Sequence, residues 1–267
     1  MTAAAESRLA PPVRPLRDRL IDFTVWGCLA VLLAVSFGPV ELNRFPLLFS
    51  NSARIGEFLN GFMRPDFSAF GSYAREMWET VQIALWGTLL AVIAAVPFGL
   101  LCARNIAPAP VVWVTRRLMD VLRSVNELVI GILFVVAVGL GPFAGVMALA
   151  LHTTGVLAKL FSEAVEAIDH GPVEGVRATG ASPVEEVVWG VLPQVAPLWT
   201  SYALYRFEAN ARSATVLGLI GAGGIGQLLF EALNGFAYGQ ASAIVIVIIV
   251  AVSVIDTLSQ VIRKRLL

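Results

Sequence analysis

Reactive side chains are scarce in this sequence of 267 residues. It contains two cysteines, Cys28 and Cys102, and two histidines, and these form no metal-ligating or catalytic spacing. Both cysteines lie in apolar runs, where we expect small core side chains rather than a disulfide or a metal site. The sequence has no Walker A lysine motif and no Gly-x-Ser-x-Gly motif. We therefore expect that this chain does not itself hydrolyse ATP.

Charge is also scarce, because only 14% of the residues are charged and 57% are hydrophobic. The 19 cationic and 19 acidic side chains cancel, so no overall field points to a nucleic-acid partner. A helix needs roughly 20 apolar residues to cross the hydrocarbon core of a membrane. Lipid offers no partner to unpaired backbone groups, so an all-α polytopic membrane protein is predicted. Six segments predict its transmembrane helices: 20–38, 79–103, 118–139, 143–165, 195–219 and 241–262.

The distribution of Lys and Arg predicts the orientation of these helices. Arginines cluster before the first helix, after the second helix and at the C-terminus, whereas 220–240 contains neither Lys nor Arg. These positions favour both termini inside the cell, with 166–194 on the cytoplasmic side. The predicted organisation is a disordered basic tail over 1–19, a first helix and outer loop over 20–75, a membrane core over 76–262 and a basic tail over 263–267.

The predicted outer loop contains a short amphipathic pattern between Ile55 and Met63. Its apolar residues recur at helical spacing, which is typical of a helix lying in the outer membrane interface. An ordered loop packed on the protein is an equally good interpretation.

The polar segment 166–194 predicts a helix, a glycine turn and a second helix. We expect Glu174 in the first turn of the first helix, where a carboxylate is favourable, and Gly180 as its left-handed cap. Ser182 to Glu185 reads as the capping box of a new helix, and Leu192-Pro193 marks entry into the fifth span. A segment that merely links two spans is the alternative.

The fifth predicted span carries ionisable residues, which in a membrane often mark a translocation pathway. Glu208 and Arg212 are spaced i,i+4 with the acid first, a spacing that fits both a structural pair and a pair of pathway residues. Arg206 and Asn210 form a second stripe, and Arg206 has no acid three or four residues away. An arginine beside an amide suits a tetrahedral oxyanion. Extension of Arg206 towards the cytoplasmic interface is the alternative.

Two further polar features belong to the membrane core. Asn126-Glu127 interrupts the third span, where we expect an interhelical hydrogen bond. A GxGxxG pattern follows the fifth span, but no βαβ unit surrounds it, so a nucleotide site is not expected. We interpret its glycines as a tight turn near the outer mouth of a pathway: Gly221, Gly223, Gly224 and Gly226.

The segment 166–194 resembles the Glu-Ala-Ala signature of bacterial ABC-importer permeases. Glu174, Gly180 and Leu192-Pro193 match that pattern at its fixed spacing, whereas Gly175-Val176 and Gly190 depart from it. The resemblance implies that this segment docks into a groove of a separate ATPase subunit. It assigns that coupling role to six residues: Glu174, Thr179, Gly180, Ala181, Ser182 and Pro193.

Residues 75–265 resemble the phosphonate ABC-importer permease family, most strongly over Ala214–Gly226. The resemblance implies a type I importer permease with a methionine-importer-like fold in the bacterial inner membrane, working as a homodimer. It implies two ATPase subunits that bind ATP and Mg²⁺, a periplasmic binding protein, and no cofactor in this chain. The implied cargo is phosphonate, phosphite or phosphate. A permease of this fold for methionine or a sulfonate is the alternative, and a membrane enzyme or channel fits less well.

Overall fold

The computed structural model describes residues 16–50 and 52–266, in which the regular elements are all helices and no strand occurs. They form two compact units, Met1–Leu59 and Asn60–Leu267, which are considered separately below. The predicted disordered tail over 1–19 lies mostly outside the described residues. The first helix already begins at Leu16 rather than at residue 20.

The first unit consists of the long helix α1 (Leu16–Phe37), a 3-10 turn (Leu42–Arg44), the short α2 (Leu47–Ser50) and most of α3 (Ser52–Phe62). Helix α1 is apolar over Leu20–Phe37 and none of that window is buried. Cys28 is therefore exposed, and its assignment as a core side chain was wrong because α1 has no partner helix within its own unit. The amphipathic pattern is helical in α3, and its place in a membrane interface stays a prediction.

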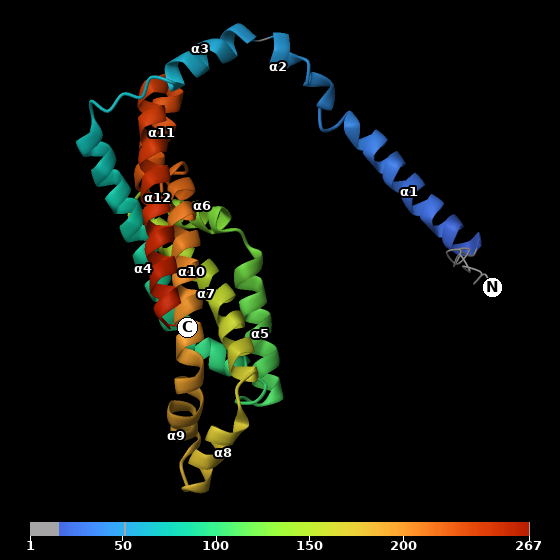
Figure 1. Cartoon of the computed structure of the whole chain (residues 1–267), viewed down its shortest axis with the longest axis vertical. Helices are drawn as coiled ribbons and strands as arrows, with labels where there is room; N and C mark the ends of the chain where they lie inside the picture. Colours follow the sequence, from blue (N-terminus) through green and yellow to red (C-terminus); the bar gives the residue numbers. More distant parts are fainter. Residues whose placement is uncertain (1–15, 51, 267) are drawn as a thin grey trace, which may run out of the picture. The chain divides into compact units, whose positions relative to one another are not determined.

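The second unit is a bundle in which α7 packs against α4, α5, α6 and α10 (Figure 1). Its helices are α4 (Phe70–Cys102), α5 (Ala109–Ser124), α6 (Glu127–Val138), α7 (Pro142–Glu166), α8 (His170–Ala178), α9 (Pro183–Glu185), α10 (Leu192–Gly218), α11 (Ile225–Asn234) and α12 (Tyr238–Leu266). The chain from Glu186 to Val191 is a π-helix that leads directly into α10.

The helices of the bundle approach closely because small residues face large ones. A Cβ added to Gly87 would lie 2.8 Å from the Cβ of Leu149, and one added to Gly99 would lie 2.8 Å from the Cβ of Phe161. Small residues allow such close helix packing where lipid provides no hydrophobic driving force. Cys102 lies in this core with 1% of its surface exposed, as the sequence predicted.

The predicted third span is not one helix. Helices α5 and α6 meet at an angle of 86°, because the backbone is extended at Val125 and Asn126. The side chain of Asn126 then accepts a hydrogen bond from the backbone of Leu128 at 2.8 Å and starts α6. By length and composition, four described helices could span a membrane (α1, α4, α7 and α12), or five if the bent pair counts as one span. Helix α10, with its central ionisable residues, is not among them.

Candidate functional site

The segment 166–194 projects from one end of the bundle as a helical hairpin (Figure 1). Gly180 adopts a left-handed φ of +82°, and Ser182 with Glu185 forms the capping box, as predicted. Helix α10 begins at Leu192, also as predicted. The position of Glu174 was predicted wrongly. Asp169 caps α8 by accepting a hydrogen bond from Gly171, so α8 begins at His170 and its first turn contains no acid.

Two contacts that the sequence reasoning missed hold the base of this hairpin. The Gln194 amide accepts from the Asp169 backbone at 3.1 Å and donates to the carbonyls of Asp169 and Gly190 at 3.1 and 2.6 Å. A Cβ on Gly190 would lie 3.0 Å from the Cα of Val173. The π-helix therefore packs closely on α8 at this glycine.

An ion pair closes the hairpin. The Arg177 guanidinium donates to both carboxylate oxygens of Glu186 at 2.9 and 2.8 Å. This hydrogen bonding holds the pKa of Glu186 below its ordinary value and raises the pKa of Arg177. The backbone and hydroxyl of Ser182 likewise lower the pKa of Glu185. All three groups are ionised at neutral pH, so the hairpin presents a defined shape.

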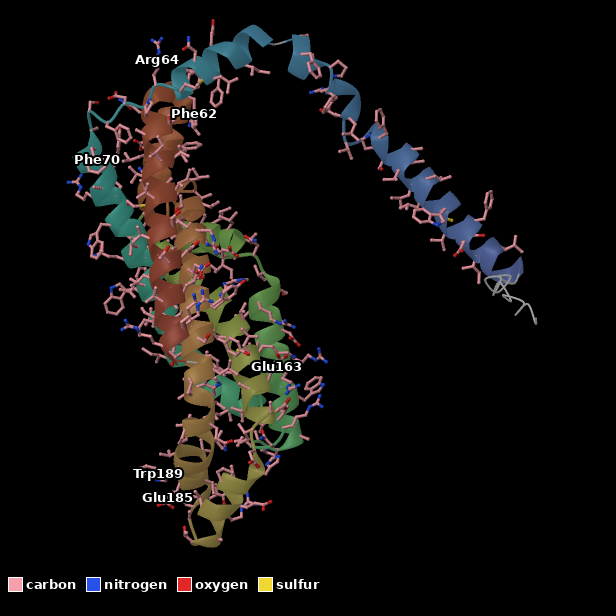
Figure 2. The ribbon with its side chains drawn as sticks, in the orientation of Figure 1. Phe62, Arg64, Phe70, Glu163, Glu185 and Trp189 are labelled. Carbon is pink, nitrogen blue, oxygen red and sulfur yellow. The ribbon has the colours of Figure 1, made fainter. Side chains whose placement is uncertain are left out.

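The exposed tip of the hairpin combines a hollow with apolar side chains. A shallow hollow of about 620 Å³ is lined by Pro172, Gly175, Val176, Thr179, Gly180, Ala181, Glu185 and Trp189. Trp189 is 70% exposed and Val184 is 71% exposed, and Figure 2 shows Glu185 and Trp189 at this end. Of the predicted coupling residues, Thr179, Gly180 and Ala181 line the hollow. Glu174, Ser182 and Pro193 are exposed nearby on the same segment but do not line it.

A polar network lies inside the bundle around Asn210 of α10, whose side chain is fully buried. Its amide donates to the Thr88 hydroxyl of α4 at 2.9 Å and accepts from the Thr153 hydroxyl of α7 at 3.1 Å. Arg206 donates to the same Asn210 oxygen at 3.3 Å. The network thus joins three helices. No local sequence pattern predicts its two threonines, because they are 122 and 57 residues away from Asn210.

Arg206 has unused hydrogen-bonding capacity. Its buried Nε has no hydrogen-bond partner among the described residues. The nearest compensating charge is Glu127 of α6, which acts on Arg206 electrostatically and accepts a hydrogen bond from the Ser213 hydroxyl at 2.8 Å. That bond confirms the interhelical contact predicted for Asn126-Glu127. His152 is not isolated, because its Nε2 lies 3.7 Å from the Glu127 carboxylate.

Glu208 and Arg212 form the predicted pair at 3.4 Å, but both also contact α12. Arg212 pairs with Asp256 at 3.2 Å, and Arg263 pairs with Glu208 at 3.1 Å. The four side chains alternate in charge and join α10 to α12. This arrangement favours the structural interpretation of the Glu208–Arg212 stripe.

The Asp256→Asn substitution is expected to lower the free energy of unfolding by about 1 kcal/mol, because Arg212 is half-exposed and keeps Glu208. That loss corresponds to a decrease in Tm of about 2–4 °C. Thermal unfolding of the purified protein would measure it. Glu231→Gln is the control, because this exposed carboxylate contacts the neutral amide of Gln227. Equal Tm values for Asp256→Asn and Glu231→Gln would contradict a structural role for the cluster.

The glycine segment after α10 is a tight turn. Gly221, Gly223 and Gly224 have φ values of +84°, +84° and +80°, where side chains are disfavoured. The backbone of Gly224 donates to Glu79 at 3.0 Å, and the backbone of Ile225 donates to Thr80 at 2.8 Å. Gly226 packs directly on the end of α10. The turn is thus fixed to α4, and its predicted role at the mouth of a pathway stays a prediction.

No cluster of three or more His, Cys, Asp or Glu side chains that could bind a metal occurs in the described part of the chain. The described residues of the second unit form a helical bundle with helices long and apolar enough to span a membrane, an exposed hairpin and a buried polar centre. Comparison with known proteins identifies its relatives.

Residues 95–267 match the family of binding-protein-dependent transport system inner membrane components. The chain is 45% identical over 204 residues to the phosphite transport system permease protein PtxC of Stutzerimonas stutzeri, covering 76% of this chain and 74% of that protein. It is 63% identical over 119 residues to the cryptic phosphonate transport system permease protein PhnE2 of Escherichia coli, covering 45% of this chain and 98% of that protein.

The fold is similar to that of a solved importer. An inward-facing crystal structure of the MetNI methionine ABC transporter superposes with a TM-score of 0.67 at 19% identity, covering 76% of this chain and 99% of that one. This likeness supports the methionine-importer-like fold implied by the sequence. The chain is a multi-pass inner-membrane transport component rather than an enzyme, and it belongs to the binding-protein-dependent transport system inner membrane component family.

Proposed function

We propose that this chain is the permease subunit of an ATP-driven importer that moves phosphonate, phosphite or phosphate across the inner membrane. The 45% identity to a phosphite transport permease over 204 residues carries the proposal. The unpartnered Nε of Arg206 supports it, because a buried guanidinium can offer paired donors to an oxyanion. A permease for methionine or a sulfonate, built on the same fold, is the alternative.

Membership of the family implies partner ATPase subunits and a periplasmic binding protein. We propose that the ATPase subunits bind the ATP and Mg²⁺ and that this chain holds no cofactor. We further propose six membrane crossings with both termini in the cytoplasm, and a homodimer with one ATPase for each copy. Closure of the ATPases on ATP would draw the two 166–194 hairpins together and open the pathway outwards. Hydrolysis would return it to the inward-facing state.

The pathway is proposed to run past the Arg206–Asn210 face of α10. Both side chains belong to the buried network of α4, α7 and α10. Glu208 and Arg212, the other pathway candidates, bind α12 instead and are proposed to hold the bundle together. The glycine turn at Gly221–Gly226 is proposed to fix the outer end of the pathway.

The hollow at the tip of the hairpin is proposed as the docking site for the ATPase. Thr179, Gly180 and Ala181 line it, and the exposed Trp189 at its edge offers a large apolar contact. Glu174, Ser182 and Pro193 would contact the partner at the periphery or support the hairpin.

The Gly180→Ala substitution is expected to weaken ATPase docking by roughly 5- to 30-fold. A left-handed conformation costs a non-glycine residue about 1–2 kcal/mol, although an added Cβ would meet no atom within 4 Å. Co-purification of the ATPase with the tagged permease would measure this. Gly71→Ala is the matched control, because it adds the same methyl group where no atom lies within 4 Å, at the start of α4 and outside the hollow. Equal retention of the ATPase by both variants would contradict the docking role of this turn.

Uptake tests the cargo directly. Cells that lack their own phosphite uptake and express this chain with its partners are expected to accumulate labelled phosphite or phosphate. Excess phosphonate should compete, and methionine should not. Competition by methionine or a sulfonate alone would replace the proposed cargo with the alternative.

A further inference from the structure

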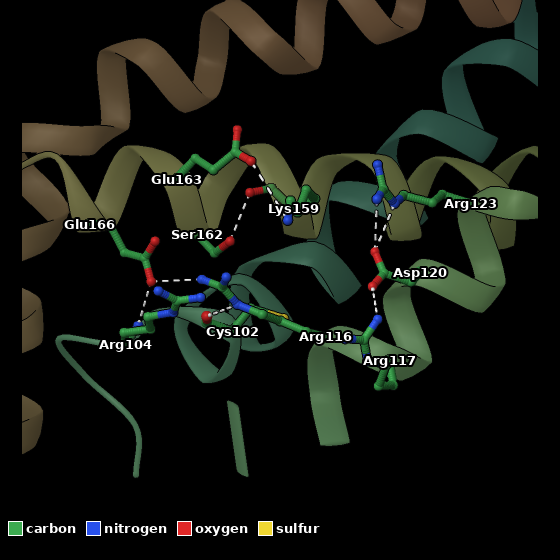
Figure 3. Close-up of polar contacts among 10 residues, drawn as sticks. All are labelled: Cys102, Arg104, Arg116, Arg117, Asp120, Arg123, Lys159, Ser162, Glu163 and Glu166. Carbon is green, nitrogen blue, oxygen red and sulfur yellow. Dashed lines mark hydrogen bonds and ion pairs between the residues drawn. The ribbon is translucent and has the colours of Figure 1, made fainter. Parts of the chain in front are cut away.

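We infer that a basic groove beside α5 binds the phosphate headgroup of an anionic phospholipid. The groove has a volume of about 540 Å³ and is lined by Arg104, Ala107, Ala109, Val112, Trp113, Arg116, Arg117, Asp120, Arg123 and Lys159. Five of these side chains are cationic and one is acidic. The groove runs along α5 beside Lys159 of α7, and Figure 3 shows its charged side chains. None of the network residues around Asn210 lines it.

One of the five cations, Arg116, forms structural contacts that hold the helices together. Arg116 donates to the Cys102 carbonyl at 2.9 Å and to the Glu166 carboxylate at 2.7 Å. Glu166 also accepts from the backbone of Arg104 at 2.7 Å. These contacts tie the α4–α5 connection to the end of α7 and form the base of the groove. The Arg104 side chain has no partner among the described residues, so its charge is available.

The remaining cations are incompletely neutralised. Asp120 is shared by Arg117 at 3.4 Å and Arg123 at 2.8 Å, so one carboxylate faces two guanidinium groups (Figure 3). Among the described residues, the Lys159 ammonium has one acidic partner, Glu163, at 3.8 Å. Five cations therefore face three carboxylates in this cluster, which leaves a surplus of positive charge. An anion with several oxygens would balance this surplus charge and accept hydrogen bonds from several of the cations.

The surroundings identify the source of that anion. Trp113, Val114 and Leu118 are 64%, 59% and 48% exposed along the outer side of α5, so an apolar surface adjoins the groove. A lipid offers a charged headgroup and apolar chains side by side, whereas free phosphate would gain nothing from this surface. Tryptophan and arginine at the boundary of a membrane helix are typical of the interface. Basic pockets between transmembrane helices on the cytoplasmic side bind anionic headgroups.

The assignment to the cytoplasmic leaflet rests on the proposed function and its orientation, but binding itself does not require transport. Native mass spectrometry of the full chain in detergent would measure binding of phosphatidylglycerol and of phosphatidylcholine with the same acyl chains. We expect preference for phosphatidylglycerol, and binding roughly tenfold weaker in the Arg104→Gln/Arg117→Gln double variant. Arg64→Gln/Arg75→Gln is the charge-matched control, because Arg75 near the start of α4 and Arg64 before that helix do not line the groove, and it should bind as the wild type does.

Any of the next four results would overturn the inference. Equal binding of the two lipids, or full binding by the double variant with an unchanged Tm, would show that the groove is not a headgroup site. Displacement of phosphatidylglycerol by millimolar inorganic phosphate would identify a site for the free anion. If the double variant bound lipid normally but no longer retained the ATPase, the groove would bind an acidic protein surface instead of a lipid. If the chain carried another cargo, phosphite uptake would fail while the lipid preference persisted.

Discussion

Replacement of Arg206 by alanine is expected to reduce phosphite uptake by about 10- to 100-fold while leaving the complex assembled. A hydrogen bond to a charged group contributes about 1.5–3 kcal/mol, and each 1.4 kcal/mol is a factor of ten. Asn210 keeps its bonds to Thr88 and Thr153 without the arginine, so the contacts among α4, α7 and α10 survive. Transport assays in proteoliposomes, with the amount of assembled complex measured in parallel, would test this.

Two further variants separate a pathway role from a structural one. Arg206→Lys keeps the charge but loses the planar pair of donors, so we expect partial recovery of uptake. Arg212→Gln changes a cation of the same helix that pairs with Asp256 of α12. We expect this variant to have a lower Tm but nearly normal uptake. Normal uptake by Arg206→Ala at normal expression would remove Arg206 from the pathway.

Replacement of Gly226 by alanine is expected to lower the free energy of unfolding by about 3 kcal/mol or more, so that little folded protein accumulates. The added Cβ would overlap the Thr215 carbonyl oxygen and lie 2.9 Å from the Cα of Gly218. Both obstacles are backbone atoms of α10, which cannot move aside as a side chain can. Overpacking of this kind commonly costs 1–3 kcal/mol, and backbone contacts place this site at the upper end.

Fluorescence-detected size-exclusion chromatography and thermal unfolding would measure the loss. Gly71→Ala is the control, because the same change at the start of α4 meets no atom within 4 Å. A Gly226→Ala protein as stable as Gly71→Ala would contradict the close packing of α10 on the glycine turn.

Features that depend on near neighbours in the sequence could be predicted. The left-handed turn at Gly180 and the capping box from Ser182 to Glu185 involve residues within four positions of each other, and both are present. The Glu208–Arg212 pair is equally local. The Asp169 cap is also a local feature, since Asp before a short helix is a frequent N-cap, but the prediction placed Glu174 in the first turn and so began the helix too late.

The break between α5 and α6 was missed for a different reason. Apolar residues continue through 118–139, and a hydropathy window averages over the extended backbone at Val125 and Asn126. Asn126 carried the signal, because asparagine followed by an acid is typical of a helix start. We expected from it only a hydrogen bond between helices.

The partners of the buried residues could not be predicted. Thr88 and Thr153 meet Asn210 across 122 and 57 residues of sequence, and Asp256 meets Arg212 across 44. One sequence alone gives no means of pairing such distant positions. Glu208 and Arg212 were grouped with Arg206 as pathway candidates because all three lie on one helix. The contacts of Glu208 and Arg212 with α12 separate that pair from the Arg206–Asn210 stripe.

The most direct test of the proposed function is the ATPase activity of the complete complex in proteoliposomes with its binding protein. Phosphonate, phosphite, phosphate and methionine would each be supplied in turn. The account predicts that one or more of the phosphorus oxyanions stimulates ATP hydrolysis and that methionine does not. Stimulation by methionine alone would keep the fold and the coupling hairpin, but it would contradict the proposed cargo and the role of Arg206.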